Sequence, residues 1–398
     1  MICMKIKSIN EAKNLKGKTV FLRADFNVPI KQDRVKEDYK IIAGLSTIRF
    51  LLRYGCKVIV STHLGDPGGK KNLKLTTLPV AKRLEKLLGK KITFINDSIG
   101  SKVETLIKKI NPGQVVFLEN LRFHAGEEKN DKNFAKQLAR LADIYVNNAF
   151  AVSHREHASV SAIKKYLPAY AGLLVEAELK NINKALKPEK PLIVVIGGAK
   201  ISTKLPIIKK FIKSAEHILV GGAIANDFLK NLGFEVGKSL VGKDGKISKQ
   251  LVGIYKKYGN KKIILPLDFL VSDNRAGSGK LTVKKVTEIN KKDYIYDIGP
   301  QTILFYSRYL KKAKTIVWNG PMGLFENEKF KHGTLSVARV IASHTSGKAF
   351  GVVGGGETIE ALKLTRMIGY IDWVSTGGGA MLDYLAGEKM PGLKGIVR

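Results

Sequence analysis

The chain has 398 residues, more than one ordinary hydrophobic core accommodates, so its length predicts two domains. The composition is that of a globular protein, and no apolar run approaches the ~20 residues of a membrane span, so we expect no membrane partner. The formal charge of +35 leaves three explanations open: nucleic-acid binding, a polyanionic small substrate, or the lysine enrichment that accompanies growth at high temperature.

The distribution of the lysines and the number of cysteines narrow the possible functions. The lysines are scattered over predicted helices without interleaved aromatic residues, which favours a solvated surface, so we expect no specific nucleic-acid partner. Cys3 and Cys56 are too few for a disulfide framework and lack metal-ligand spacing. Met1 to Asn10 contain no signal-peptide core, and we therefore expect a cytoplasmic protein.

In the first half of the chain, short apolar runs alternate with segments of helical periodicity such as Leu78–Leu88 and Phe134–Leu141. This alternation predicts a parallel sheet with helices on both faces. The predicted strands are Val20–Leu22, Val58–Val60, Ile92–Phe94, Val115–Leu118 and Ile144–Val146.

A helix followed by a proline-containing break marks the joint between the two halves. Leu173–Leu186 has helical spacing, and Lys187–Pro191 ends it. We expect a first domain over 1–172, a connecting helix over 173–187 and a second domain over 188–387.

The second half repeats the pattern. Leu270–Val286 indicates a β-hairpin, and its Gly277–Lys280 lacks the upstream glycine and the following Ser/Thr of a P-loop. The fold class is therefore α/β, with two doubly wound, Rossmann-like parallel-sheet domains and a cleft between them. The predicted strands here are Leu192–Ile196, Ile218–Val220, Ile263–Leu265, Thr315–Trp318 and Phe350–Val353.

Glycines follow the predicted strands of the second half. Ile196–Lys204 has the order strand, glycine turn and helix N-terminus, which binds anions through free backbone N–H groups and the helix dipole. Lys200 and Lys204 would share one face of that helix, and lysine is a compact charge that can follow a phosphoryl group. Several such starts around one crevice would hold a polyphosphate. The glycine clusters are Gly197-Gly198, Gly221-Gly222, Gly320, Gly354–Gly356 and Gly377–Gly379.

The predicted strands of the first half end in charged and polar side chains. Because parallel strands end at one edge of a sheet, these side chains would line a basic face suited to a small anionic metabolite. They are Asp25, Asn27, His63, Arg122, His154 and Arg155. Three other histidines are assigned ordinary structural roles: His217, His332 and His344.

No Ser-His-Asp arrangement, glycosidase carboxylate pair or metal-type cluster is recognisable. A polyphosphate domain and a small-anion domain together indicate direct phosphoryl transfer, which needs positioning and charge neutralisation more than a protein nucleophile.

These residues belong to longer motifs, which stand in the chain as Arg23–Pro29, His63–Gly65, Glu119–His124, His154–His157, Gly197–Lys200, Leu265–Phe269, Asp297–Pro300, Trp318–Glu326, Gly354–Thr358 and Ser375–Ala380. In identity and order the motifs resemble those of phosphoglycerate kinase along nearly the whole chain, and the lysine content suggests the archaeal branch. The resemblance implies reversible phosphoryl transfer from 1,3-bisphosphoglycerate to MgADP, giving 3-phosphoglycerate and MgATP. Mg²⁺ would be the cofactor, and we expect a monomer or a homodimer.

The resemblance also implies residue roles. The glycerate and its 3-phosphate would be held by Asp25, Asn27, Lys40, His63, Arg122, His154 and Arg155. The nucleotide would be held by Gly198, Ala199, Lys200, Lys204, Gly222, Asn319, Pro321, Glu326, Gly354, Gly355, Gly356, Glu357 and Thr358. Catalytic roles would fall to Lys200, Lys40, Gly355 and Gly378, and Glu357 would bind the metal. The tail 388–398 would return to the first domain.

Three departures from the family pattern stand out. Lys40 replaces the catalytic arginine, Asp66 replaces another arginine, and Glu357 replaces the metal-binding aspartate. The first two remove guanidinium groups from the anion site. Two alternatives therefore stay open: a catalytically inactive paralogue, and, because of the charge, a nucleic-acid-binding protein on a kinase-like scaffold.

Overall fold

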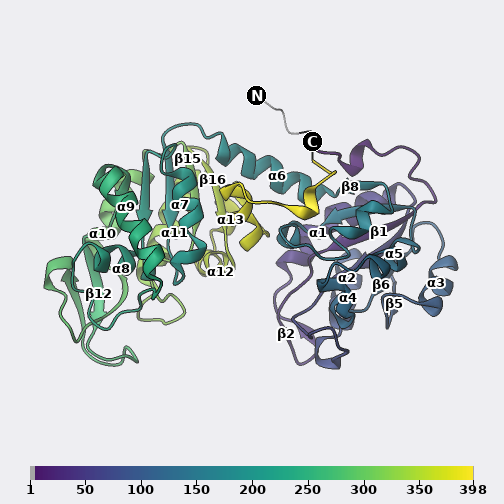
Figure 1. Ribbon diagram of the computed structural model, residues 1–398, viewed down its shortest axis with the longest axis horizontal. Helices are drawn as coiled ribbons and strands as arrows, with labels where there is room; N and C mark the ends of the chain where they lie inside the picture. Colours follow the sequence, from purple (N-terminus) through teal and green to yellow (C-terminus); the bar gives the residue numbers. More distant parts are fainter. Residues whose placement is uncertain (1–4, 398) are drawn as a thin grey trace. The chain divides into compact units, whose positions relative to one another are not determined.

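The computed structural model describes residues 5–397, and these form two compact units (Figure 1). Unit 1 runs to Lys180 and includes the segment from Glu388 onward, and unit 2 comprises Asn181–Gly387. The boundary lies within helix α6 (Leu173–Leu186), whose bounds are those of the segment with predicted helical spacing.

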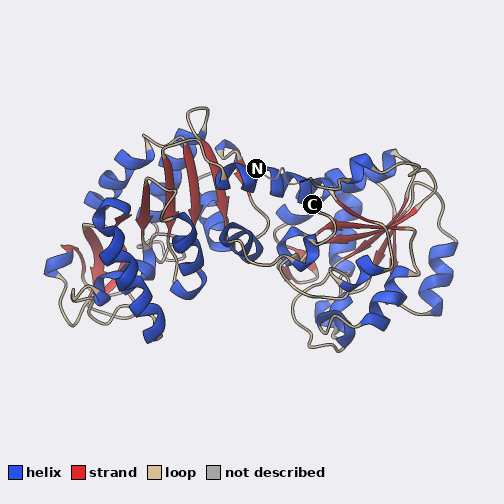
Figure 2. Cartoon of the chain, turned by 45° about the horizontal axis from the view of Figure 1, so that its top comes forward, coloured by secondary structure: helices blue, strands red, loops and turns tan. Residues whose placement is uncertain are grey.

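Unit 1 is built on a six-stranded sheet in the order β5-β6-β4-β1-β7-β8, with every neighbouring pair parallel. Figure 2 shows helices packed on both sides of this sheet. The strands are β1 (Thr19–Ala24), β4 (Lys57–Ser61), β5 (Ile92–Ile95), β6 (Val115–Leu118), β7 (Ile144–Asn148) and β8 (Ala169–Ala171). The helices are α1 (Tyr39–Arg53), α2 (Leu78–Leu88), α3 (Ser101–Lys108), α4 (Ala125–Glu128) and α5 (Lys132–Ala139), and a short antiparallel pair joins β2 (Ile30–Lys31) to β3 (Arg34–Val35).

Unit 2 has a second parallel sheet, in the order β11-β10-β9-β15-β16-β17. Its strands are β9 (Leu192–Ile196), β10 (His217–Val220), β11 (Ile263–Ile264), β15 (Thr315–Asn319), β16 (Phe350–Gly354) and β17 (Trp373–Val374). Its helices are α7 (Leu205–Phe211), α8 (Gly222–Asn231), α9 (Gly245–Lys262), α10 (Pro300–Leu310), α11 (His332–Thr345), α12 (Gly356–Leu364) and α13 (Gly379–Ala386).

The central strands are apolar along their whole length because helices cover both faces of each sheet. Every residue of β6 and of β9 is buried. Residues pointing to either face therefore leave water, which is why these strands appear in the sequence as continuous apolar runs.

The strand orders of the two parallel sheets indicate where a ligand can bind. In unit 2 the chain runs from β9 outward to β11, then crosses to β15 and runs outward to β17. In unit 1 the same reversal lies between β1 and β7. At such a reversal the loops after the two neighbouring strands diverge and leave a crevice at the carboxyl edge of the sheet.

The two-domain α/β class is confirmed, and all ten predicted strands are present. Sequence analysis missed the two edge strands β8 and β17, which are only three and two residues long. The predicted hairpin forms from β12 (Asp268–Ser272) and β13 (Leu281–Lys285), and β14 (Tyr294–Ile298) makes it a three-stranded antiparallel sheet.

The C-terminal segment is bonded into unit 1. The Gly392 N–H donates to the carbonyl of Ser153 at 2.8 Å, and the Gly392 carbonyl accepts from Asn147 Nδ2 at 3.0 Å. Lys164 Nζ donates to the carbonyls of Pro391 (2.6 Å) and Lys394 (2.8 Å). Among the described residues, no helix is long and apolar enough to cross a membrane.

Candidate active site

In unit 1, the charged side chains predicted for an anion site gather where β1, β4, β6 and β7 end. Asp25 follows β1, His63 follows β4 and Arg122 follows β6, so the parallel sheet delivers them to one edge. His154 and Arg155 follow β7, and their side-chain nitrogens lie 3.4 Å apart.

Asp25 is a buried carboxylate that contacts a lysine and a histidine at this edge. Lys40, from the first turn of α1, donates from Nζ to Asp25 Oδ2 at 2.7 Å. His63 Nδ1 lies 3.8 Å from Asp25 Oδ1. Burial raises the pKa of Asp25, but Lys40 above all, with His63 and Arg23, outweighs it and lowers that pKa to about 2. Asp25 is therefore ionised and holds Lys40 in place.

His63 is a neutral imidazole at neutral pH. Burial lowers the pKa of His63 well below its usual value, and the Arg23, Arg122 and Lys40 charges lower it further, against the opposing effect of Asp25. It can therefore donate or accept one hydrogen bond without adding charge to the edge.

Arg122 is buried with part of its guanidinium still available. Nη1 donates to the carbonyl of Gly65 at 2.8 Å, and Nε lies 3.0 Å from Glu128 Oε1. Nη2 is buried and has no hydrogen-bond partner among the described residues. Asn27 Oδ1 accepts from the Gly65 N–H at 3.0 Å, so the loop after β4 ties Asn27 to Arg122.

Arg23, which begins the first motif, is fully buried and supports the edge from beneath. Its Nε donates to Ser159 Oγ at 2.7 Å, its Nη2 lies 3.3 Å from His63 Nδ1, and it pairs with buried Glu127 at 3.8 Å. Sequence analysis gave Arg23 no role. Its place in a motif was a signal, but only the fold shows that Ser159 and Glu127 surround it.

In unit 2, the expected free amides of the first glycine turn are already used. The Gly197 N–H donates to the carbonyl of Asn319 at 3.0 Å, and the Gly198 N–H donates to that of Pro321 at 2.8 Å. This part of the prediction was wrong because β9 and β15 are neighbours, so the loops that follow them pair with each other. A Cβ on Gly320 would lie 2.1 Å from the Gly197 carbonyl oxygen, so this close approach requires glycine.

The predicted helix start at Lys200 was also wrong. Lys200 precedes a 3-10 turn (Ile201–Thr203), and α7 begins only at Leu205, with Pro206 in its first turn. Lys200 and Lys204 therefore do not share a face of one helix. Lys200 is exposed, whereas Lys204 is partly buried and donates from Nζ to Asn319 Oδ1.

Lys204 carries an unusual pKa as a result. Burial lowers the pKa of Lys204 to about 8, although the Glu357 carboxylate opposes the shift. Glu357 lies in the first turn of α12, and its Oε2 comes within 3.7 Å of the position a Cβ of Gly198 would take. The loops after β9 and β16 thus bring a cation and a carboxylate together.

Asn319 and Thr358 hold the central loops of unit 2. Asn319 Nδ2 donates to the carbonyl of Gly354 at 2.6 Å, and Thr358 Oγ1 accepts from the Gly320 N–H at 2.7 Å. Gly355 and Gly378 precede α12 and α13 with positive φ of 100° and 51°. The first-turn N–H groups of a helix have no partner within it, so α12 and α13 offer donors at this edge.

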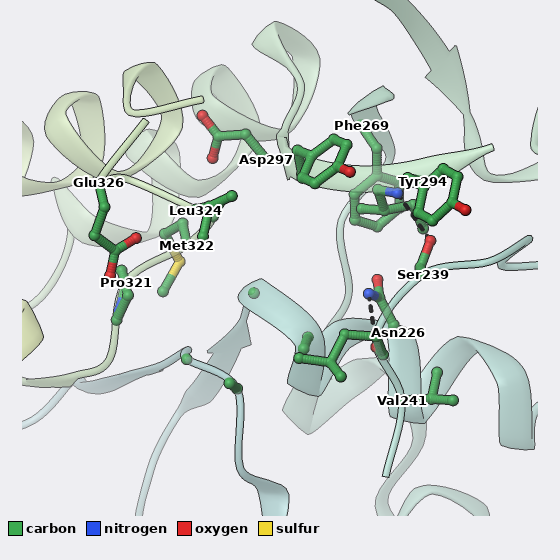
Figure 3. A pocket seen from close by; sticks show the side chains of 18 of the residues that line it. Asn226, Ser239, Val241, Phe269, Tyr294, Asp297, Pro321, Met322, Leu324 and Glu326 are labelled. Atoms are coloured by element: carbon green, nitrogen blue, oxygen red, sulfur yellow. Dashed lines mark hydrogen bonds between the residues drawn. The ribbon is translucent and has the colours of Figure 1, made fainter. Parts of the chain in front are cut away.

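A cavity of about 630 Å³ opens beside these loops (Figure 3). Pro321, Met322, Leu324 and Glu326 lie on one side, and Phe269, Tyr294, Ser239 and Asn226 lie on the other. Gly198, Ala199, Gly222 and Glu357, all predicted to bind a nucleotide, also line it. Sequence analysis missed Asn226 and Tyr294. The Gly221-Gly222 cluster four residues before Asn226 was a signal, whereas Tyr294 lies outside the motifs.

Two of the histidines set aside by sequence analysis make structural contacts. The rings of His217 and His344 hydrogen-bond the carbonyls of Lys261 and Ala313, both at 2.9 Å. Asp66 is exposed in the loop after β4, and its negative charge favours the charged form of Arg122.

Comparisons with known proteins agree along the length of the chain. A family model described as phosphoglycerate kinase matches residues 9–388. A phosphoglycerate kinase of Geotalea uraniireducens is 44% identical over 98% of this chain and 98% of its own, and that of Moorella thermoacetica is 43% identical over 95% and 96%. These relatives are bacterial, so the expected archaeal affinity is not supported.

Solved structures give the same match. The phosphoglycerate kinase of Coxiella burnetii has a TM-score of 0.86 and 36% identity, covering 98% of this chain and 99% of that chain. The structure from Pyrococcus horikoshii has a TM-score of 0.85 and 33% identity, covering 98% of each chain.

Proposed function

The chain belongs to the phosphoglycerate kinase family, and we propose how its own residues divide that family's work between the two units. The activity is phosphoglycerate kinase activity. In the proposed reaction a phosphoryl group passes from the acyl phosphate of 1,3-bisphosphoglycerate to ADP, leaving a carboxylate and forming ATP. The observation that carries the proposal is the pair of sheet reversals, with a cationic edge at one and a glycine-lined cavity at the other.

Unit 1 would bind the glycerate and its 3-phosphate. Arg122 keeps a buried Nη2 without a partner among the described residues, and a phosphate oxygen would satisfy it. Arg155 would supply a second guanidinium, and neutral His63 a hydrogen bond. Asp25 and Asn27 position Lys40 and the Gly65 loop through the bonds described above.

Unit 2 would bind ADP or ATP. The cavity takes the base and ribose, with Glu326 accepting from the ribose hydroxyls. The phosphates would lie near Gly198, Lys204 and the N-termini of α12 and α13, where backbone donors and the helix dipoles favour anions.

The residues beside Gly198 fit a magnesium ion. Mg²⁺ binds proteins through one or two carboxylates and completes its shell with substrate phosphates and water. Glu357 supplies one carboxylate at the phosphate end of the cavity, and the described residues hold no cluster of three metal-ligating side chains. When bound, Mg²⁺ would neutralise charge on the phosphate oxygens, with Glu357 as its protein ligand.

Lys200 would accompany the transferring phosphoryl group, and Lys40 would stabilise its charge from the other unit. Lys200 is exposed beside a short turn, and its side chain forms no ion pair with the described residues, which suits a moving cation. Transfer also requires that water be excluded, so we propose that the units close around both substrates, with α6 at the hinge. We propose a cytoplasmic monomer or homodimer.

The test is a coupled assay for ATP formation from 1,3-bisphosphoglycerate, applied to the wild type, Lys200→Ala and Lys256→Ala. Lys256 is an exposed lysine of α9 and serves as the control. Lys200→Ala should lower kcat by far more than it raises the KM for ADP, because its charge counts most in the transition state. A wild type without turnover would support the inactive paralogue, and a near-normal kcat in Lys200→Ala would remove that residue from the mechanism.

A further inference from the structure

Asn226 presents an unsatisfied hydrogen-bond acceptor at the wall of the unit 2 cavity. It lies on α8, is only 2% exposed, and lines the cavity (Figure 3). Its Nδ2 donates to the carbonyl of Leu240 at 3.1 Å, which fixes the orientation of the amide. Its Oδ1 is buried and has no partner among residues 5–397.

None of the polar groups around Asn226 in the described part of the chain donates a hydrogen bond to its Oδ1. Ser239 Oγ, a hydroxyl of the same wall, accepts from the Ile295 N–H at 2.8 Å. Phe269, Tyr294 and Val241 give this wall aromatic and apolar surface, and Lys238 and Lys243 also line the cavity. A buried carbonyl oxygen without a partner is costly, so the group that completes it is expected to come from the ligand.

The shape and chemistry of this wall select the kind of group. A flat ring can pack against aromatic and branched side chains, and a single acceptor beside it calls for one donor on the ring's edge. The 6-amino group of a purine is such a donor, whereas a 6-oxo group would place a second acceptor against Asn226 Oδ1.

We propose that Asn226 Oδ1 accepts a hydrogen bond from the 6-amino group of the nucleotide's purine, and that this contact makes the protein prefer ADP over 6-oxopurine diphosphates. The inference rests on the proposed use of the cavity for the base. It extends that function, because glycine loops and lysines that bind phosphates do not distinguish one base from another.

The experiment measures kcat/KM for ADP and for IDP, which differs by a 6-oxo group and the ring N–H that comes with it. The variants are Asn226→Leu and the smaller Asn226→Ala, with Asn231→Leu as the matched control. Asn231 lies on the same helix and also donates from Nδ2 to a backbone carbonyl, that of Asp227 at 2.7 Å, but it does not line the cavity.

The ratio of the two kcat/KM values is the readout, because a partly unfolded variant loses activity toward both nucleotides equally. The wild type should prefer ADP by about tenfold, the usual consequence of leaving one buried polar group unpaired. Both Asn226 variants should bring the ratio close to one, mainly through a loss with ADP, and Asn231→Leu should keep the wild-type ratio.

Each outcome decides between the proposals. Equal use of ADP and IDP by the wild type, a preference for IDP, or an unchanged ratio in a folded Asn226 variant would overturn the role of Asn226 alone. No turnover of either nucleotide by the wild type would instead overturn the proposed function. If neither Asn226 variant folds, the wild-type ratio and calorimetric affinities for ADP and IDP still decide.

Discussion

The resemblance predicts an arginine at the position of Lys40, and replacing Lys40 gives the sharpest test of the proposed active site. The perturbation is Lys40→Ala, compared with Lys40→Arg and with Lys109→Ala, an exposed lysine at the end of α3. Lysine keeps the charge of arginine but not its planar fork of donors. If Lys40 stabilises the transferring phosphoryl group, its loss should cost about 3–4 kcal/mol in the transition state, or roughly 10²- to 10³-fold in kcat. Lys40→Arg should be tolerated or beneficial.

A stability change of separate origin accompanies this substitution. Lys40 Nζ lies 2.7 Å from Asp25 Oδ2, with side-chain exposures of 29% and 8%. The pKa of Asp25 is lowered from 3.8 to about 2, which corresponds to ~2.4 kcal/mol. Lys40 is the largest of the lowering influences, so we expect Lys40→Ala to lose about 2–3 kcal/mol at pH 7.

The sign of the pH dependence follows from the lowered pKa. A carboxylate with a lowered pKa in the folded state stabilises it above the unfolded pKa, and this contribution is lost as pH falls. In the wild type the loss occurs between about pH 4 and pH 2, and in Lys40→Ala the contribution should be missing throughout.

The assays are kcat by ATP formation and urea unfolding over pH 2 to 7, with kcat measured where each variant is folded. Equal kcat for Lys40→Ala and Lys109→Ala would refute the catalytic role, and another group would then have taken over the arginine's task. Equal stability of these two variants at pH 7 would refute the energetic account of the Asp25 pair.

Three further results are expected. The pKa of Lys204 is lowered to about 8, so Lys204 loses its positive charge as pH rises from 7 to 9. Calorimetry should therefore show ADP binding that weakens over this pH range in the wild type but not in Lys204→Met. Wild-type ADP affinity that does not change with pH would contradict this. The radius of gyration from small-angle scattering should be smaller with both substrates bound than with either alone, and an unchanged value would argue against closure. Binding to DNA should be weak, independent of sequence and abolished by moderate salt, because scattered lysines attract phosphates only by counterion release; selective, salt-resistant binding would show that the charge of +35 serves a nucleic-acid function.

The sequence by itself determined most of the elements and their type. The predicted helices Leu78–Leu88 and Leu173–Leu186 have the observed bounds, and each predicted strand is present. These features depend on local periodicity and on burial over both faces of a strand, which neighbouring residues record directly. The motifs likewise indicated the family, because the residue types at the strand ends are set by the ligands they would meet.

The tertiary structure alone decided which groups are paired and which are available. The amides of Gly197 and Gly198 looked free in the sequence, but neighbouring strand β15 brings carbonyls to them. In the sequence Lys40 is one of many lysines, and only the position of α1 places it within hydrogen-bond distance of Asp25. Asn226 is likewise an ordinary polar residue in the sequence. The fold pairs its amide nitrogen with the Leu240 carbonyl and leaves its amide oxygen buried. These partners lie far apart in the sequence or on different elements, so local patterns carry no record of them, and only the packing of the sheets and helices determines how each hydrogen bond and charge is satisfied.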